Sequence, residues 1–576
     1  MIELPSGIFV WANAANRRKF DCMAPTQTAR EPKAPRPKMQ AEAPARTAAT
    51  WLRSPFALSF LASGLYWASL PPIGWRPLAW LAPIPWLMLA RQPRLPGGRP
   101  YLQLWLSGFV FWLIELYWLT LPHWATGFGL LALACYLAFY WPAFVGLLRV
   151  AVHQAKLPLM IAAPVVWTGL ELARAHLIGG FLLSALGHSQ YEWLALIQVS
   201  DLAGAYGVSF LIVLGAACVV ETWTARGLRR LVPAGIFAIA MAATLGYGHY
   251  RLNQDTLSPG PKIALIQGSI DTELKSDPSQ TRSIYDHYMQ LSVDALRGQQ
   301  DVDLVVWPET MFRYSWYTFA PDYQKPPDVE WTPAELEDNS RTAVRATAEL
   351  LGAPLLLGID SVHEGRNLTE RYNSALFADA KGKILGRYDK VHLVMFGEFV
   401  PLASRFPWLY RLTPLPGGID AGTGPRSVKV GKYGYAPNIC FESTVPHLVR
   451  SQVAELRQRG EEPDVLVNLT NDGWFWGSSE LDLHLICGVF RAIECRKPFM
   501  IAANTGFSAW IESTGSIVAQ GPRRAAGTIM ARPNLDHRQS LYLAWGDTPA
   551  GMCLAACIGL AGWGWYARRR DRHVAG

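Results

Sequence analysis

Charged residues are scarce in this sequence. Asp, Glu, Lys and Arg make up 17% of its 576 residues, whereas 50% are hydrophobic. This scarcity excludes an ordinary soluble protein. The uncharged runs gather in residues 51–250 and 549–567, while residues 255–545 have the charge and turn content of a soluble domain. We therefore expect a membrane domain with seven spanning helices, an extramembrane domain and one further spanning helix, in that order.

Metal-binding spacings and clustered basic residues are also missing. The eight cysteines show no spacing typical of a disulfide framework or a zinc site, so no metal or organic cofactor is predicted. The net charge is +8, but the basic residues flank apolar runs, and we exclude nucleic-acid binding. Residues 1–50 are rich in Ala, Pro and basic residues without an apolar core. This composition predicts a disordered cytoplasmic tail and not a signal peptide.

Eight apolar segments are candidates for membrane-spanning helices, each of which needs about 20 residues. They lie at 54–71, 73–90, 101–121, 128–150, 157–175, 207–222, 231–248 and 549–567. The connection after every second segment is basic, ending with the tail at 568–576. Because positive charge marks the cytoplasmic side, both termini are predicted to be cytoplasmic. Residues 255–545 would then lie on the periplasmic side of a bacterial inner membrane.

Two of the predicted spans contain a glutamate, Glu115 in the third and Glu171 in the fifth. A carboxylate inside a membrane is costly unless it faces a partner or water. Each glutamate therefore either contacts a polar group of a substrate or belongs to a structural pair.

Short β-rich runs alternate with amphipathic stretches from residue 262 onward, which predicts a layered α/β domain. Helical periodicity occurs at 279–297, 333–352, 444–459 and 480–496. Three of the strand-like runs end in reactive side chains, which are Glu309, Lys390 and Cys440. Strand ends are where α/β enzymes build their sites. These three residues are therefore candidates for one site, the alternative being a structural role for each alone, such as that of a plain buried hydrophobic residue for Cys440.

The three side-chain types together suffice for acyl transfer through a thioester. A thiol nucleophile needs a base to remove its proton, and a carboxylate serves when burial raises its pKa. A lysine ammonium group can stabilise the oxyanion of the tetrahedral intermediate.

The motifs around these residues resemble the nitrilase, or carbon–nitrogen hydrolase, superfamily. They are WPE at Glu309, Y-x-K-x-H-L at Lys390 and ICFE at Cys440. Further runs resemble the apolipoprotein N-acyltransferase family within it, among them KVHLVMFGEFVPL, NLTNDGWFWGSS, ANTGFSAWI and GHSQYEWLALIQVSDLAGAYGVSFL. The resemblance covers about residues 50–567. It implies an α-β-β-α sandwich carried by a polytopic helical membrane domain.

The resemblance also implies a role for each matching residue. Cys440 would be the nucleophile and Glu309 the general base and acid. Lys390 would stabilise the oxyanion, with the backbone N–H of Phe441 as a second donor. No metal is implied.

Two further glutamates of the family match Glu398 and Glu442. We expect Glu398 to orient Lys390 and Glu442 to brace the nucleophile turn, the alternative being a purely structural salt bridge for either. The chain departs from the family at Phe441, where Tyr is usual, and at Ser276, where Trp is common. These departures bear on how the acyl chain or lipoprotein is held, not on the acyl-transfer chemistry.

The implied reaction has two steps. Cys440 takes an acyl chain from a membrane phospholipid, and the α-amino group of an apolipoprotein's diacylglyceryl-cysteine then attacks the thioester. The aromatic stretches 311–323 and 474–479 would dip into the bilayer interface and admit the acyl chain, or else form a mobile, aromatic-capped surface loop.

Two other functions fit parts of the pattern. One is a membrane-tethered amidase or nitrilase, which would use water as the acceptor at a site closed to lipid. The other is a transporter or receptor with a degenerate nitrilase-like domain, against which all three intact catalytic side-chain types argue.

Overall fold

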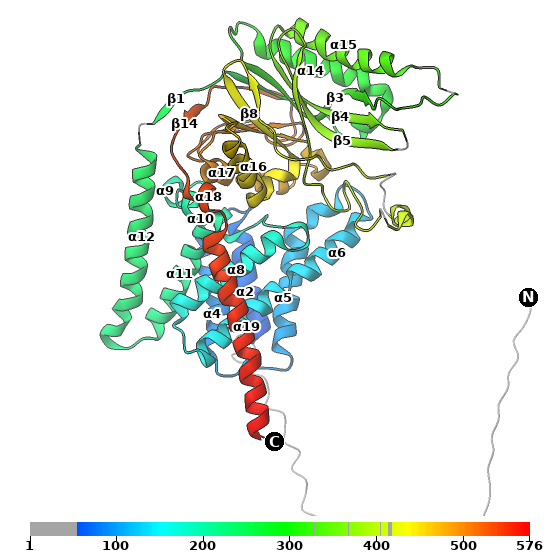
Figure 1. Ribbon diagram of the computed structural model, residues 1–576. Coiled ribbons are helices and arrows are strands. Elements are labelled where there is room, and N and C mark those ends of the chain that lie inside the picture. The colour runs from blue at the N-terminus through cyan, green and yellow to red at the C-terminus, as the bar shows by residue number, and fades with distance from the viewer. Residues whose placement is uncertain are drawn as a thin grey trace, which may run out of the picture. The chain divides into compact units, whose positions relative to one another are not determined.

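The computed structural model describes residues 54–254, 256–327, 329–366, 368–403, 405–412 and 417–575, with no description of the side chains of Leu412 and 571–575. The tail predicted at 1–50 lies outside these residues. Figure 1 shows two parts, a helical part below and an α/β part above.

The helical part is built from the helices between Pro55 and Leu252, together with the last helix of the chain. They are α2 (Pro55–Ser69), α3 (Leu78–Leu81), α4 (Ile84–Arg91), α5 (Pro100–Glu115), α6 (Thr126–Leu137), α7 (Tyr140–Arg149), α8 (Leu159–His176), α9 (Leu194–Ile197), α10 (Ser200–Ala203), α11 (Ala205–Thr224), α12 (Leu231–Leu252) and α19 (Thr548–Ala575). Its core is rich in aromatic rings, for example Trp86 and Trp141 with centroids 4.7 Å apart.

Four helical stretches in the described residues are long and apolar enough to cross a membrane. They are Thr126–Gln154, Ala205–Thr224, Gly227–Leu252 and Thr548–Arg570. They coincide with the fourth, sixth, seventh and eighth predicted spans. The other four predicted segments contain no described helix that is both long and apolar enough to cross a membrane. In the second of these, Pro83 separates the short helices α3 and α4, because proline lacks the N–H that a helix interior needs. The count of eight spans therefore stays a prediction.

Both glutamates predicted in the spans are buried and contact one segment of the chain. The hydroxyl of Ser184 donates to Glu115 at 2.6 Å, and the backbone N–H of Leu186 donates to Glu171 at 3.1 Å. These contacts fit the structural alternative for both residues, since each glutamate anchors the segment that follows α8.

The α/β part contains two six-stranded sheets and their helices. The strands are β1 (Leu257–Pro259), β2 (Ile263–Gln267), β3 (Leu304–Phe319), β4 (Leu355–Glu364), β5 (Thr369–Ala378), β6 (Ile384–Asp389), β7 (Val428–Val430), β8 (Tyr433–Ile439), β9 (Val465–Thr470), β10 (Phe499–Ala503), β11 (Ala509–Ile511), β12 (Ile517–Gln520), β13 (Gly527–Ala531) and β14 (Asn534–Asp536). The helices are α13 (Thr272–Ser276), α14 (Thr281–Leu296), α15 (Pro333–Leu351), α16 (Pro446–Gln458), α17 (Glu480–Cys495) and α18 (Leu541–Trp545). The predicted alternation of strands with four amphipathic helices is confirmed.

The sheets have the strand orders β13-β2-β3-β4-β5-β6 and β12-β11-β10-β9-β8-β7. Strand β3 shows why they stack. Val305 and Trp307 point to the core beneath α14 and α15, whereas Leu304 and Val306 point to the second sheet, as the two-residue period of a strand requires. The helices α16 and α17 lie on the outer side of the second sheet, so the layers run helix, sheet, sheet, helix (Figure 1).

The aromatic stretch 311–323 is not a mobile loop. Strand β3 runs through it to Phe319, and Phe312 and Trp316 are buried in the core beneath α14 and α15. Because aromatic residues occupy both faces of this strand, the sequence hides its alternation. Phe312 and Trp316 are therefore not available to a bilayer, and that expectation is wrong for them.

The two parts share a continuous hydrophobic core at the side of α16 and α17. One ion pair, between Asp201 and Arg496, crosses this junction, and the Asp201 carboxylate also pairs with Arg251 of α12 within the helical part. Asp201 of α10 lies 2.9 Å from Nε of Arg496 and 2.8 Å from Nη2 of Arg251. Glu494 of α17 accepts the backbone N–H of Ala205 at 3.0 Å. Buried charges paired in this way hold the α/β part on the helical part.

Candidate active site

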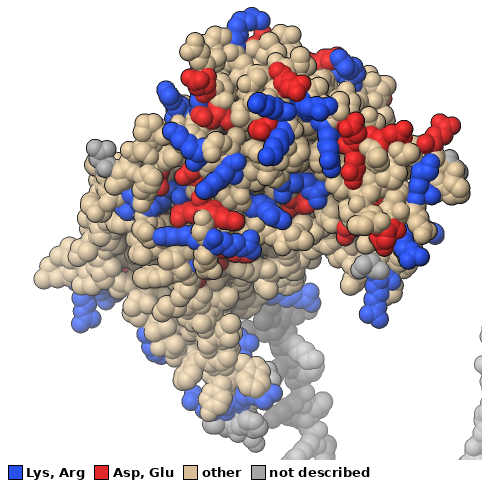
Figure 2. Space-filling view, turned by 45° about the horizontal axis from the view of Figure 1, so that its top comes forward, with Lys and Arg blue, Asp and Glu red and all other residues tan. Residues whose placement is uncertain are grey.

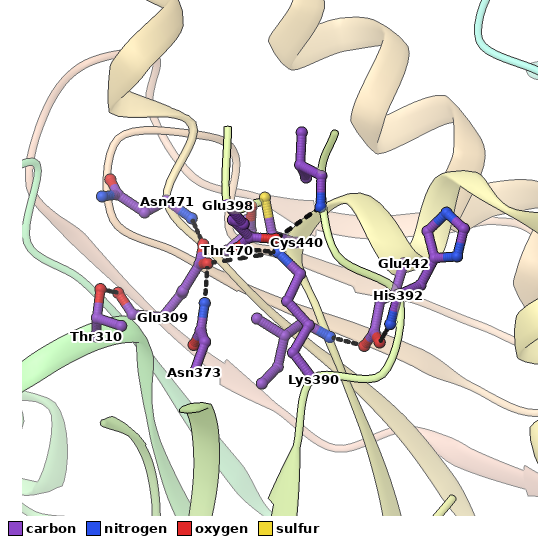
Figure 3. Close-up of polar contacts among 12 residues, drawn as sticks. Glu309, Thr310, Asn373, Lys390, His392, Glu398, Cys440, Glu442, Thr470 and Asn471 are labelled. Atoms are coloured by element: carbon purple, nitrogen blue, oxygen red, sulfur yellow. Dashed lines mark hydrogen bonds and ion pairs between the residues drawn. The ribbon is translucent and has the colours of Figure 1, made fainter. Parts of the chain in front are cut away.

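The predicted base, Glu309, lies where the pairing of β3 with β4 is interrupted. The register shifts between Trp307 and Phe312, and Thr310 adopts a φ of 54°. The Glu309 carboxylate is buried, and both of its oxygens are bonded. The amide of Asn373 donates to Oε1 at 2.6 Å, and the backbone N–H of Asn471 donates to Oε2 at 2.9 Å. Figure 3 shows this carboxylate between the two donors.

Lys390 directly follows β6 and is almost completely buried, at 1% exposure. Its Nζ lies 2.7 Å from Oε1 of Glu398 and 3.9 Å from Oε1 of Glu309. The ammonium group is thus held between two carboxylates, which leaves it close to Glu309 without a tight contact (Figure 3). Glu398 is itself fixed by the backbone N–H of Val394, at 2.8 Å from Oε2.

Cys440 is the first residue after β8 and has a φ of 51°. This is the left-handed region of backbone conformation, which residues other than glycine rarely adopt. Its carbonyl oxygen accepts the side-chain amide of Asn468 and the hydroxyl of Ser443, both at 3.1 Å. These bonds stabilise the strained backbone. The side chain is partly exposed, as a nucleophile must be. Figure 3 places its sulfur beside Lys390 and Glu398.

Burial sets the protonation of the three groups. It raises the pKa of Glu309, with Lys390 opposing and Glu398 reinforcing the shift. Burial also raises the pKa of the Cys440 thiol, and the Glu309 carboxylate adds to this effect. Burial alone would lower the pKa of Lys390, but Glu398 and the other nearby anions outweigh it and raise that pKa. The resting site therefore holds a thiol, a carboxylate with high proton affinity and a permanent cation.

Glu442 is fully buried and connects two loops of the site. It accepts the backbone N–H groups of Val391, His392 and Ile439 at 2.7 to 2.9 Å, and the hydroxyl of Tyr388 at 2.9 Å. These donors flank Lys390 on one side and Cys440 on the other. Glu442 thus ties the loop that carries Lys390 to the turn that carries Cys440.

The two positions that depart from the family differ in their surroundings. Phe441 is partly buried, and its ring stacks on that of His392 with centroids 5.9 Å apart. Ser276 ends α13 and is exposed, with its hydroxyl bonded to the carbonyl of Thr272. Phe441 thus keeps a defined contact beside the nucleophile, whereas Ser276 offers no large apolar surface.

A network beneath Cys440 was not predicted as functional. The imidazole of His484 lies 3.1 Å from Oδ1 of Asp472, 2.7 Å from the hydroxyl of Ser443 and 3.2 Å from the carbonyl oxygen of Cys440. Thr470 donates to Asp472 at 2.6 Å. Burial would lower the pKa of His484, but the Asp472 carboxylate outweighs it and raises that pKa.

Sequence reasoning also missed Asn373 and the backbone N–H of Asn471, which bind the Glu309 carboxylate. Their signal was present in the RYNSA and NLTND runs, but neutral donors attract no attention as candidate catalysts. Asp472, Glu480 and His484 are close enough to hold a metal ion. Asp472 and His484 bond to each other and to the hydroxyls of Thr470 and Ser443, and these contacts support the turn at Cys440.

Comparisons with known proteins identify the two domains of the chain. The family model described as "Apolipoprotein N-acyltransferase N-terminal domain" matches residues 62–218, and that described as "Carbon-nitrogen hydrolase" matches residues 262–542. The α/β part is thus a carbon–nitrogen hydrolase domain, which confirms the predicted nitrilase-type sandwich. An amidase structure from Nesterenkonia sp. is 18% identical over 50% of this chain and 95% of that chain, with a TM-score of 0.33.

Two curated relatives match nearly the whole chain. The apolipoprotein N-acyltransferase of Rhodopirellula baltica is 32% identical, and the match covers 88% of this chain and 97% of the relative. That of Geobacter metallireducens is 33% identical, with 88% and 95% covered. Both matches include the helical part as well as the hydrolase domain. The chain belongs to the apolipoprotein N-acyltransferase family.

Proposed function

We propose that this protein N-acylates bacterial lipoproteins, moving an acyl chain from a membrane phospholipid through a thioester on Cys440 to the α-amino group of the N-terminal diacylglyceryl-cysteine. The observation that carries the proposal is the placing of the Lys390 ammonium, 3.9 Å from the Glu309 carboxylate and next to the Cys440 thiol. Nucleophile, base and oxyanion donor are the complete set that acyl transfer requires.

In the first step, Glu309 accepts the thiol proton as the Cys440 sulfur attacks the ester carbonyl of the phospholipid. The Lys390 ammonium and the backbone N–H of Phe441 stabilise the resulting oxyanion. The C–O bond of the ester then breaks, and Glu309 returns its proton to the departing alkoxide. The products are a lysophospholipid and an acyl thioester.

In the second step, the α-amino group of the lipoprotein attacks the thioester carbonyl, and Glu309 takes one of its protons. The same donors stabilise the second oxyanion. The C–S bond breaks, the thiolate recovers the proton from Glu309, and the product leaves with an amide bond. The high proton affinity that burial gives Glu309 suits it to both transfers.

Glu398 would act through Lys390. Its 2.7 Å contact keeps the lysine side chain extended toward the nucleophile and keeps its amine charged despite burial. A neutral lysine would be a much weaker oxyanion donor, so Glu398 is a positioning residue and not a proton carrier.

The helical part would sit in the inner membrane. Figure 2 shows charged side chains over the α/β part, whereas the helical part is mostly uncharged on this face. We propose eight spans, both termini in the cytoplasm and the catalytic domain in the periplasm, because basic residues follow every second span. The corresponding division of the chain is a tail at 1–50, a membrane domain at 51–250, a catalytic domain at 255–545, a last span at 549–567 and a basic tail at 568–576.

The loop 474–479 is the best-placed contact with lipid. The side chains of Trp474 and Trp476 are exposed, at 41% and 52%. Between them, Phe475 packs edge-on against Trp118 of the helical part, with centroids 4.9 Å apart. This contact fixes the loop beside the helices, where two exposed indoles would meet the membrane interface and guide an acyl chain toward the site.

Mass spectrometry of the purified protein incubated with phospholipid tests the proposal. An acyl adduct on Cys440 is expected, removable by hydroxylamine and discharged when a diacylated lipopeptide is added. The Cys440→Ser variant should carry no such adduct, whereas Cys135→Ser, which removes an exposed thiol outside the site, should keep it. A folded protein without an adduct would contradict the mechanism. Discharge to water instead of to the lipopeptide would favour the amidase alternative.

A further inference from the structure

Three potential metal ligands from distant parts of the sequence meet where α8, α16 and α19 come together. His176 is the last residue of α8, His447 is the second residue of α16, and Asp547 directly precedes α19. One ligand atom of each lies within 4.8 Å of those of the other two. The cluster joins the helical part to the hydrolase domain and is separate from the catalytic residues.

The distances are close to those of a metal site. Nε2 of His176 lies 2.9 Å from Oδ2 of Asp547, and the rings of His176 and His447 stack with centroids 3.9 Å apart. Zinc with bonds of about 2.0–2.1 Å in tetrahedral geometry holds its ligand atoms about 3.3 Å apart. Binding one ion would require the two imidazole rings to turn out of their stack so that a nitrogen of each faces the ion.

A hydrogen bond from a residue outside the cluster orients the Asp547 carboxylate. The hydroxyl of Tyr542 donates to Oδ1 of Asp547 at 2.6 Å, which leaves Oδ2 directed at His176. Ligands of protein-bound metals are commonly fixed by such outer hydrogen bonds.

An ion pair between His176 and Asp547 would explain only two of the three residues. Nδ1 of His447 is buried and has no hydrogen-bond partner among the residues that the structure describes.

We propose that His176, His447 and Asp547 bind one divalent transition-metal ion of the zinc class. Two imidazoles and a carboxylate are a ligand set that zinc accepts, with a fourth position left to water. The ion clamps the end of α8 and the start of α19 to the start of α16. Close by, Nε2 of His392, two residues after Lys390, lies 3.0 Å from the carbonyl oxygen of Gly179. The clamp thus stiffens the junction beside the loop that carries Lys390.

Zinc titration of the full-length protein tests the site. The protein is purified in detergent, stripped with EDTA and titrated with zinc chloride in competition with a chromophoric chelator. All measurements use the Cys440→Ser background, because the catalytic thiol is itself a zinc ligand. This background also separates the result from the proposed activity. We expect one zinc ion per chain, and an X-ray absorption spectrum with two imidazoles and oxygen ligands at about 2.0–2.1 Å.

Three substitutions locate the ion. His176→Ala, His447→Gln and Asp547→Asn are each expected to weaken zinc binding about tenfold or more. His537→Ala removes an exposed histidine outside the cluster and should leave binding unchanged. Circular dichroism confirms that each variant is folded, and the near-isosteric glutamine avoids a cavity at His447. Zinc binding that survives all three substitutions, or a folded protein that takes up no zinc, would overturn the proposal.

Discussion

Buried carboxylates occur in both parts of the molecule, but their hydrogen bonding differs. In the α/β part, both oxygens of Glu309 and of Glu442 receive donors, several of them backbone N–H groups. In the helical part, Glu115 is held by the Ser184 hydroxyl, and Oε2 of Glu171 has no partner among the described residues. The difference teaches that burial alone does not identify a catalytic acid. The number of donors instead separates the carboxylates that are fixed among the active-site loops from those that anchor the segment after α8.

Among the buried carboxylates, Glu309 should give the largest loss of acylation rate when it is replaced by glutamine. The amide keeps the shape of the side chain but cannot take a proton from the thiol or from the amine. We expect the single-turnover rate of Cys440 acylation to fall by about 10² to 10⁴. Mass spectrometry of the acyl-enzyme over time measures this rate. A variant that keeps more than about a tenth of the rate would remove Glu309 from the base role.

Asp201→Asn tests a buried carboxylate at the junction, where the partners are charged. The substitution leaves the guanidinium groups of Arg496 and Arg251 buried without an anion. We expect the free energy of unfolding to fall by about 3–5 kcal/mol, as measured by denaturant unfolding in detergent. Asp286→Asn, which breaks only the exposed pair with Arg282, is the control and should leave the unfolding midpoint in place. Equal effects of the two substitutions would contradict the junction's role.

The pH dependence of acylation sharpens the assignment of Glu309. The base acts only when deprotonated, and burial raises its pKa above the ordinary range of glutamate. As the pH falls through this raised pKa, the acylation rate should drop about tenfold per pH unit. The fall of the acylation rate on the acid side of the pH profile should therefore occur at a higher pH than it would with an exposed glutamate as the base. In Glu309→Gln this fall should disappear, and a fall that persists would belong to another group.

Glu115→Gln should have the smallest effect. The amide oxygen can still accept the Ser184 hydroxyl, so the anchor of the segment after α8 is kept. We expect the acylation rate to change by less than about threefold and the unfolding free energy by about 1 kcal/mol or less. Glu115→Leu, which removes the acceptor, should be more damaging. If the glutamine variant instead loses acylation, Glu115 contacts the substrate.

Much of the α/β part could be predicted because strand and helix periods are legible in its sequence. The main miss was the far half of β3, where Tyr317 and Phe319 add aromatic residues at odd positions to Phe312, Tyr314 and Trp316 at even positions and so hide the alternation. In the helical part, composition predicts apolar segments but not how long each helix is. Prolines such as Pro83 decide that, and their effect depends on the neighbouring packing.

The three candidate catalytic residues stand out in the sequence because each is a titratable side chain at a strand end. The donors around them do not, since Asn373 and the backbone N–H of Asn471 carry no charge and reach Glu309 only in the folded chain. The cluster of His176, His447 and Asp547 has no spacing signal at all. Its members come from the end of α8, the start of α16 and the turn before α19, which only the tertiary structure brings together.

The short ribbon formed by β1 and β14 has an evolutionary consequence. Leu257 pairs with Asp536 and Pro259 with Asn534 in antiparallel register, so the hydrolase domain begins and ends at the same place. A domain whose ends meet can be inserted into one loop of another protein without separating the ends of that loop. An ancestral helical protein with a simple turn between α12 and α19 could therefore have acquired the enzyme in one recombination event. The β1–β14 ribbon would then mark the place where the two proteins were joined.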